Sequence, residues 1–314
     1  MINGESKTME NSQIYIIGAG AIGKALAVFL QQEGKQVVLV RGSVDNQSDV
    51  ENLITVSYQS TQEFTQAITT TTLSNLTEIN GIVLITAKAF ANGELAEKLK
   101  GKKGMFSVVL LQNGLNVESS FESFDEVYRC VLLSTSQVMS DNIVLFKTVT
   151  ASPVGSVKGE NSNTDMIVNQ INTPYFGFRS EPNIVKYVWN KVIVNCAFNS
   201  ICPLLEIDNG IFYRDAEAVK LAGMIIDECT TLAQKYNIVL DRNEIEENLL
   251  LISKRADGQL ISTYEDIRKK RRTEIESLNL EIARMADEIE MPELVPTTRL
   301  LGEMIKIKSE IKLS

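Results

Sequence analysis

The residues best suited to chemistry in this chain begin with a glycine-rich run that follows a β-branched segment. Residues 14–17 read Ile-Tyr-Ile-Ile, and Gly18-Ala19-Gly20-Ala21-Ile22-Gly23 comes directly after them. In a G-x-G-x-x-G loop between a strand and a helix, the first glycine allows a tight turn, the second lets the backbone approach a pyrophosphate, and the third permits close helix–strand packing. The helix N-terminus offers free N–H groups to the anion. The spacing therefore predicts a dinucleotide-binding loop.

The end of the next expected strand indicates which dinucleotide binds. NAD sites of this type place an Asp or Glu there, to accept a hydrogen bond from the ribose 2′-hydroxyl, whereas this chain has Arg41-Gly42-Ser43. The guanidinium of Arg41 can pair with a 2′-phosphate, and Ser43 can add a hydrogen bond. NADP(H) is therefore favoured over NAD(H). Two alternatives stay open: Arg41 is simply solvated, or nearby Asp45 acts as the acid.

Two more polar residues follow expected strands. Lys88 comes after residues 82–86, and Asn113 comes after residues 107–112. Ligands of open α/β sheets bind outside the carboxyl ends of the strands, so both residues are placed to touch cofactor or substrate. Asn-Gly is also a common turn, and a single lysine is usually solvated.

A polar stripe interrupts an apolar helix-like segment in the second half of the chain. Lys191, Asn195 and Asn199 stand at i, i+4 and i+8, so they share one helix face. Their neighbours are mostly apolar, and a lysine with two amides in such surroundings suits a small anionic ligand. A solvent-facing stripe on an amphipathic helix is the alternative.

A second polar segment spans residues 262–275. It contains Ser262, the basic run Lys269–Arg272 and then Glu274 between Thr273 and Ile275. The basic run is typical of a solvated helix face. Glu274, which lies between Thr273 and Ile275, can turn toward a pocket instead.

The chain contains no histidine. This absence excludes histidine zinc sites, Ser-His-Asp triads and histidine general bases, so Lys, Glu, Asp, Tyr or Cys must transfer any proton. We expect no metal site.

The elements that must position these residues alternate between strands and helices in the first half. Expected strands are 14–17, 36–40, 82–86, 107–112, a region near 130–134, and 143–149, with a first helix over 22–32 that ends at Gly34. This order predicts an α/β fold with a parallel sheet over residues 14–182. Residues 183–314 have helical periodicity and predict an all-α second domain.

Composition limits the remaining function classes. The 314 residues carry a net charge of −9, which disfavours nucleic acid and anionic lipid as partners. The four cysteines lack C-x-x-C spacing and indicate buried, reduced thiols in a cytoplasmic protein. No apolar run is long enough to span a bilayer. Residues 1–13 have no signal-peptide character and are expected to be a disordered or tag-like tail.

Taken together, these motifs resemble the ketopantoate reductase (2-dehydropantoate 2-reductase) family over nearly the whole chain. The matching residues are Gly18–Gly23, Ala87-Lys88-Ala89, Gln112-Asn113-Gly114, Trp189-Asn190-Lys191 with Asn195 and Asn199, Ser262 with Asp266, Arg271-x-Thr273-Glu274, and Pro296-x-x-Arg299-Leu300. The resemblance implies a Rossmann-type doubly wound domain and a helical domain, with NADPH and ketopantoate meeting in the cleft between the two domains. It also implies NADPH-dependent reduction of ketopantoate to D-pantoate in pantothenate (coenzyme A) biosynthesis.

The resemblance also implies residue roles. Lys191 corresponds to the catalytic lysine and Glu274 to the active-site glutamate. Asn195, Asn199 and Ser262 correspond to substrate-binding residues, Asn113 to a residue near both nicotinamide and substrate, and Lys88 to the lysine on the cofactor side. We hypothesise that Lys191 protonates the nascent alkoxide while Glu274 accepts a hydrogen bond from a substrate hydroxyl.

Two other functions remain open at this point. The first is a D-2-hydroxyacid dehydrogenase for another branched or aromatic 2-keto acid, NAD-linked or not. The second is a non-catalytic protein that senses NADP(H). We expect a small-molecule substrate, no nucleic-acid or membrane partner, and a monomer or homodimer.

Overall fold

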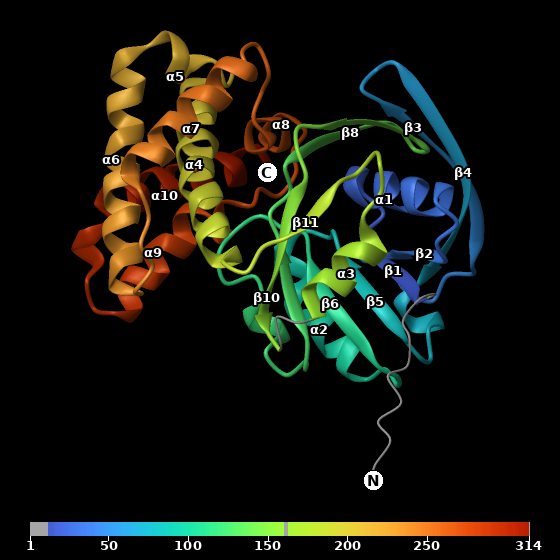
Figure 1. Cartoon of the computed structure of the whole chain (residues 1–314). Coiled ribbons are helices and arrows are strands. Elements are labelled where there is room, and N and C mark those ends of the chain that lie inside the picture. The colour runs from blue at the N-terminus through green and yellow to red at the C-terminus, as the bar shows by residue number, and fades with distance from the viewer. Residues whose placement is uncertain (1–11, 160–162, 314) are drawn as a thin grey trace. The chain divides into compact units, whose positions relative to one another are not determined.

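The computed structural model describes residues 12–159 and 163–313, and it has the expected α/β class. A sheet rich in parallel strands occupies the first part of the chain and helices make up the rest (Figure 1). Contacts group residues 12–112 and 118–184 into one compact unit, and residues 113–117 and 185–313 into a second. We describe each unit by itself. The expected tail lies outside the described residues as far as residue 11, and Gln13 already belongs to the first strand.

The eleven strands that the structure describes in the first unit form one sheet, with the order β11-β10-β7-β6-β5-β1-β2-β4-β3-β9-β8. The strands are β1 (Gln13–Ile17), β2 (Val37–Arg41), β3 (Val50–Tyr58), β4 (Gln62–Thr72), β5 (Gly81–Ile85), β6 (Phe106–Leu110), β7 (Val127–Cys130), β8 (Ser134–Ser140), β9 (Ile143–Thr148), β10 (Ser152–Lys158) and β11 (Phe178–Ser180).

The centre of the sheet is parallel and matches the sequence prediction. β1 pairs in parallel with β2 and β5. β5 in turn pairs in parallel with β6, and β6 with β7. The carboxyl ends of these strands therefore lie along one edge, as a ligand site in an open α/β sheet requires. The strand expected near 130–134 is misplaced, because β7 ends at Cys130 and β8 begins at Ser134.

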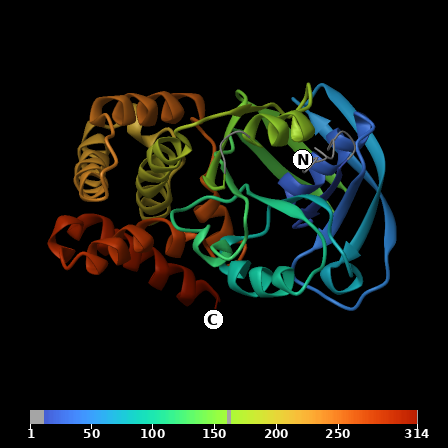
Figure 2. The same ribbon diagram turned by 60° about the horizontal axis from the view of Figure 1, so that its bottom comes forward.

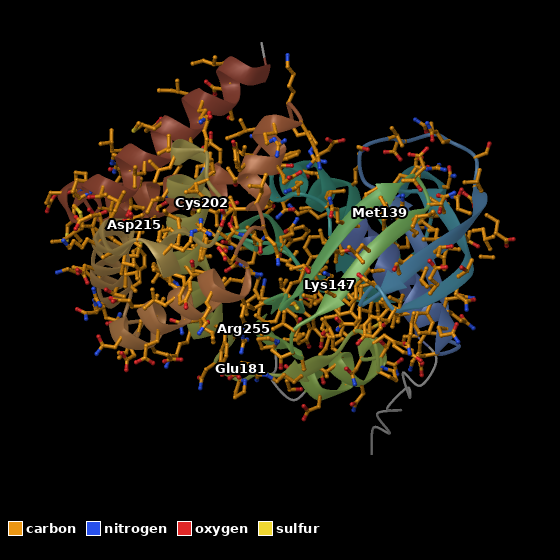
Figure 3. All side chains as sticks on the ribbon, turned by 90° about the horizontal axis from the view of Figure 1, so that it is seen from above. Met139, Lys147, Glu181, Cys202, Asp215 and Arg255 are labelled. Carbon is orange, nitrogen blue, oxygen red and sulfur yellow. The ribbon has the colours of Figure 1, made fainter. Side chains whose placement is uncertain are left out.

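Beyond β2 the sheet curls over helix α1 (Ala21–Gln32), as Figure 1 shows. The antiparallel pair β3 and β4, together with β9 and β8, forms this part. Figure 3 shows the side chains from above, with Met139 labelled on β8 and Lys147 on β9. Phe29 of α1 packs against four aromatic rings at centroid distances of 5.4 to 5.9 Å, from Tyr58, Phe64, Phe146 and Tyr175. This aromatic cluster fixes α1 against the curled sheet.

Two shorter helices complete the first unit. Helix α2 (Asn92–Lys100) follows β5, and α3 (Thr164–Ile171) lies between β10 and β11. The N–H of Gly34 bonds to the carbonyl of Gln31 at the end of α1, and its φ of 73° is the left-handed cap expected there.

The second unit consists of helices in sequence order. They are α4 (Ile184–Leu205), α5 (Ile211–Arg214), α6 (Ala216–Lys235), α7 (Arg242–Arg255), α8 (Ser262–Arg268), α9 (Asn279–Glu288) and α10 (Pro296–Leu313). Figure 2 shows α10 in dark red at the C-terminal end. Asp215, labelled in Figure 3, caps α6 by accepting from the N–H groups of Glu217 and Ala218.

The four cysteines are buried free thiols, as expected. Burial raises the pKa of Cys202 to about 12 and raises that of Cys196 well above its ordinary value. These two thiols are therefore inert in the folded protein. Among the helices of the described residues, none is long and apolar enough to cross a membrane.

Candidate active site

The glycine loop has the geometry that a dinucleotide needs. Gly18 has a φ of 121°, and a Cβ on it would lie 2.6 Å from the amide nitrogen of Ala87. A Cβ on Gly23 would overlap the carbonyl oxygen of Gly18. A Cβ on Gly20, at the N-cap of α1, would meet nothing within 4 Å. Gly18 and Gly23 are thus required by the fold, whereas Gly20 leaves open backbone where a pyrophosphate can approach.

The end of β5 holds this loop in place. The Thr86 hydroxyl donates to the carbonyl oxygen of Gly18 at 2.9 Å. The backbone N–H groups of Thr86 and Ala87 both donate to the carbonyl oxygen of Ile17, at 2.9 and 3.1 Å. Strand β5 therefore sets the position of the loop that follows β1.

Arg41 lies at the end of β2, as predicted, and is half-buried. Its Nη1 atom is buried and has no hydrogen-bond partner among the described residues. A buried guanidinium nitrogen of this kind is costly unless an acceptor binds it. A 2′-phosphate beside Arg41 would supply that acceptor.

The carboxylate of Asp45, the alternative ribose ligand, is already engaged. It accepts from the N–H of Ser74 at 2.8 Å and pairs with Lys98 at 2.8 Å. The hydrogen bond from Lys98 is the main reason that the pKa of Asp45 falls to about 2, and the N–H of Ser74 contributes. Asp45 therefore anchors the segment after β2 to α2 and to the segment after β4.

Lys88 follows β5 and is half-buried, in a turn that a buried amide pair supports. The Nε2 atom of Gln112 donates to the carbonyl of Ala87 at 2.7 Å. Gln112 and Asn92 also exchange hydrogen bonds between their side-chain amides, at 2.7 and 2.9 Å. Sequence reasoning missed Gln112 and Asn92 as supports of the site, because an amide pair has no spacing signal.

In the second unit, the predicted polar stripe lies on α4. Lys191 and Asn195 are half-buried and Asn199 is only 3% exposed. The Nδ2 atom of Asn199 donates to the carbonyl of Asn195 at 2.9 Å, while its Oδ1 atom is buried without a hydrogen-bond partner among the described residues. The stripe is therefore not a solvent-facing helix surface, and Asn199 retains an acceptor for a donor group.

Asn279 braces this helix from the start of α9. It is fully buried, and its Nδ2 atom donates to the carbonyl of Cys196 on α4 at 3.3 Å and to that of Thr298 on α10 at 3.5 Å. A single side chain thus links three helices next to the polar stripe. Sequence reasoning did not identify it.

Glu274 and the Asn113-Gly114 turn belong to the same unit and are joined through Ser277. The N–H and hydroxyl of Ser277 both donate to the Glu274 carbonyl at 3.0 Å, and Ser277 accepts from the N–H of Leu115 at 3.0 Å. Gly114 has a φ of 106°, and a Cβ on it would lie 2.6 Å from that of Ser277. Only glycine permits this approach. The turn that contains Asn113 is therefore bound, through Ser277, to the segment that contains Glu274.

The segment before Glu274 is held by an ion pair. Ser262, the first residue of α8, is exposed, whereas Asp266 one turn later is buried and pairs with Arg271 at 2.6 Å. The basic run Lys269–Arg272 is exposed, as expected, and Lys269 pairs with Glu265 at 2.7 Å. This hydrogen bond is the main cause of the lowered pKa of Glu265.

Comparisons with known proteins agree with these features. A family model described as "Ketopantoate reductase PanE/ApbA" matches residues 14–157, and one described as "Ketopantoate reductase PanE/ApbA C terminal" matches residues 183–309. The 2-dehydropantoate 2-reductase of Pyrococcus horikoshii is 24% identical over 95% of this chain and 98% of its own length. That of Aquifex aeolicus is 25% identical over 93% of this chain and 96% of its own.

Solved structures show the same fold. D-mandelate dehydrogenase with NADH and anilino(oxo)acetate superposes with a TM-score of 0.83 at 20% identity, covering 96% of this chain and 99% of that one. Dimeric ketopantoate reductase from Staphylococcus aureus superposes with a TM-score of 0.77 at 20% identity and the same coverage. The family models cover both units, and on that ground the chain belongs to the ketopantoate reductase family of oxidoreductases.

Proposed function

We propose that this protein reduces 2-dehydropantoate (ketopantoate) to D-pantoate with NADPH. The observation that carries the proposal is the polar stripe on α4, where Lys191 is half-buried beside two asparagines in a chain without histidine. A lysine in such a position can supply both positive charge and a proton to a developing alkoxide. The names of the Pyrococcus and Aquifex relatives support this substrate.

The first unit offers residues that fit NADPH. The backbone of Gly18, Ala19, Gly20, Ala21, Ile22 and Gly23 would hold the pyrophosphate, and Arg41 would pair with the 2′-phosphate. Lys88 would add positive charge on the cofactor side, and Asn113 would contact both cofactor and substrate. When bound, NADPH supplies the hydride that reduces the 2-keto carbon.

The second unit provides the proton and the substrate contacts. Lys191 donates the proton that the carbonyl oxygen takes up as that oxygen becomes a hydroxyl, so hydride and proton together complete the reduction. Glu274 accepts a hydrogen bond from the hydroxyl group of the substrate and orients it. Asn195, Asn199 and Ser262 bind the remaining polar groups, for which Asn199 Oδ1 is an available acceptor.

The test is the oxidation of NADPH, followed by its absorbance, with ketopantoate as substrate. We expect kcat/KM to be highest for ketopantoate with NADPH and lower with NADH. 2-Ketoisovalerate is the matched control, because it lacks the hydroxymethyl group that Glu274 is proposed to bind. Equal rates on both acids would remove Glu274 from this role, and no oxidation with ketopantoate would overturn the proposed substrate.

A D-2-hydroxyacid dehydrogenase is the second candidate, favoured by the TM-score of 0.83 with D-mandelate dehydrogenase. That enzyme was solved with NADH. Faster reduction of phenylglyoxylate than of ketopantoate, especially with NADH, would select this candidate.

A further inference from the structure

Asn279, the first residue of α9, is bound to two other helices at once. It is fully buried, and its Nδ2 atom donates to the carbonyl of Cys196 on α4 at 3.3 Å and to that of Thr298 on α10 at 3.5 Å. A Cβ on Gly302 of α10 would lie 2.8 Å from that of Asn279, so α9 and α10 approach each other closely at this point. The side chain therefore has a fixed place between α4 and α10.

Both acceptors of this side chain are held firmly. Cys196 is fully buried in α4, directly after Asn195 of the polar stripe. Thr298 is fully buried as well, and Glu228 of α6 accepts from its N–H at 2.8 Å and from its hydroxyl at 2.7 Å. Asn279 is thus tied to the helix that carries the polar stripe and to a second helix that α6 fixes.

A short turn connects Asn279 to Glu274. Between them lie a turn of 3-10 helix, Ile275–Ser277, and Leu278. The N–H of Ser277 donates to the Glu274 carbonyl at 3.0 Å, which closes the turn. Because this hydrogen bond stiffens the connection, a shift of Asn279 along α4 would carry the backbone of Glu274 with it.

Apolar packing alone does not define the position of this segment. Ile275 belongs to a buried cluster with Ile267, Leu280 and Ile305. Such contacts have no direction, so they hold the segment in the core of the helical unit without fixing its register along α4. The hydrogen bonds of Asn279 supply that direction, because a hydrogen bond depends on angle as well as distance.

The second polar atom of Asn279 indicates that stability is not its main contribution. Its Oδ1 atom is buried and has no hydrogen-bond partner among the described residues. An acceptor in this state lowers the stability of the fold. An apolar side chain would avoid that loss, but it could not donate to the two helix carbonyls.

We propose that Asn279 is a positioning residue, which sets where the Glu274 carboxylate lies relative to Lys191 on α4. The inference rests on the proposed function, in which Glu274 binds the hydroxyl group of the substrate and Lys191 donates the proton. Asn279 acts through Glu274 and not on the substrate itself. It keeps the group that recognises the substrate in register with the group that protonates it, and so it contributes to selectivity for a 2-keto acid that carries a hydroxyl group.

Kinetics on two substrates test this role. We expect Asn279→Ala to lower kcat/KM for ketopantoate about 10- to 100-fold, as displacement of a positioned group does, and that for 2-ketoisovalerate at most about twofold. 2-Ketoisovalerate has no hydroxyl group, so its reduction should not depend on where Glu274 lies. For ketopantoate, KM should rise more than kcat falls, since the lost contact is one of binding. An equal loss on both acids would mean a merely structural role and would overturn the proposal.

Hydrogen–deuterium exchange gives a readout that needs neither substrate nor turnover. The N–H of Ser277 bonds to Glu274, and the N–H of Leu115 bonds to the Ser277 carbonyl. Both amides should exchange faster in Asn279→Ala than in the wild type, while the amides of α4 stay protected. Unchanged exchange at Ser277 and Leu115 would show that Asn279 does not hold this segment.

Ser253→Ala is the matched control. Ser253 is also fully buried in the helical unit, where its hydroxyl donates to the Asn209 carbonyl at 2.6 Å and accepts from the N–H of Tyr213 at 3.0 Å. This variant should be less stable but should keep the wild-type ratio of kcat/KM between the two acids. If circular dichroism shows that Asn279→Ala does not fold, Asn279→Ser, which keeps a donor group, is judged by the same two measurements.

The wild type separates this inference from the proposed function. A wild type that reduces both acids equally contradicts the proposed role of Glu274, and the exchange measurement then decides alone whether Asn279 fixes the segment. A wild type that prefers ketopantoate, with a preference that Asn279→Ala retains, contradicts only the positioning role.

Discussion

The side chains of Gln112 and Asn92 hydrogen-bond each other in both directions, at 2.7 and 2.9 Å, while Gln112 also donates to the carbonyl of Ala87. Both residues are buried, at 6% and 3% exposure. The pair therefore connects the end of β6 with the start of α2 and supports the turn that carries Lys88.

Replacing only one member of this pair should lower the free energy of unfolding by more than half of the loss caused by replacing both. Gln112→Leu removes the hydrogen bonds that Gln112 makes with the Asn92 side chain and the Ala87 carbonyl, and a buried group left unsatisfied costs about 1–3 kcal/mol. We expect urea unfolding to show a free energy of unfolding that is lower by at least about 1–3 kcal/mol. A fluorescence titration should show weaker NADPH binding.

The double variant provides the control. Asn92→Leu with Gln112→Leu removes both amides, so its loss should be smaller than the sum of the single losses. Additive losses would mean that the two side chains stabilise the fold independently.

Replacing two glycines of the loop should affect two different properties: Gly23 the stability and Gly20 the binding of NADPH. Gly23→Ala forces a Cβ into the Gly18 carbonyl and should lower the unfolding temperature. Gly20→Ala meets nothing within 4 Å and should keep the wild-type unfolding temperature, but its Cβ would occupy the proposed approach of the pyrophosphate and weaken NADPH binding. Differential scanning calorimetry and NADPH titration separate the effects. Tight NADPH binding by Gly20→Ala would contradict the proposed role of the loop.

Arg41 should govern the preference between the two cofactors. A charge-assisted hydrogen bond is worth about 1.5–3 kcal/mol, so Arg41→Ala should raise the Kd for NADPH roughly 10- to 100-fold and leave that for NADH nearly unchanged. Lys103→Ala makes the same change of charge before β6, away from the carboxyl ends of the strands, and should alter neither. An equal loss for both cofactors would place Arg41 away from the 2′-phosphate.

Local patterns made the start of the fold predictable. β1, α1 and β2 follow from a β-branched run, a glycine loop and the cap at Gly34, and each depends on residues within a few positions of one another. By contrast, β3 and β4 were not predicted. β4 ends in Thr69–Thr72 and buries few side chains along its first half, so its sequence has little apolar alternation. These strands form because they can pair and cover α1, which is a tertiary effect.

The candidate site likewise contains residues that the sequence predicts and residues that it does not. Motif residues such as Lys191, Asn195 and Asn199 could be placed on one helix face because helical spacing determines that face. Supporting contacts could not be predicted, since Asn279 bonds to a carbonyl 83 residues away and Gln112 pairs with an amide 20 residues away. A single sequence has no signal for contacts at such separations.

Low pH should break the ion pair between Asp208 and Arg214 in the helical unit. Asp208 accepts from Arg214 at 2.9 and 3.0 Å, and this interaction is the main reason that its pKa falls from 3.8 to about 2. Because the folded pKa lies below the unfolded one, Asp208 stabilises the fold above about pH 4, and this contribution is lost as the pH falls from about 4 to 2.

Arg214→Leu should therefore be less stable than the wild type at pH 6, and the difference should shrink below pH 4. Urea unfolding at several pH values measures it. Lys220→Leu removes a lysine from an ion pair with Glu217 that is at least 70% exposed, and we expect no such pH dependence for it. A difference between Arg214→Leu and wild type that stays constant down to pH 3 would contradict the assigned pair.

Lys191 should be required for turnover but not for cofactor binding. Loss of a positioned general acid typically costs 10²- to 10⁴-fold in rate, so Lys191→Ala should lower kcat at least about 100-fold with the Kd for NADPH unchanged. Lys191→Arg separates charge from proton donation, because a guanidinium keeps the charge but does not give up its proton. We expect it to retain the wild-type KM and to stay slow.

The matched control is Lys186→Ala. Lys186 lies on the same helix, five residues away and therefore on another face, and pairs with Glu244 at 3.5 Å. Steady-state kinetics and NADPH titration on the three variants decide the assignment. If Lys191→Arg turns over at the wild-type rate, the side chain contributes positive charge alone, and the proton must come from another group or from water.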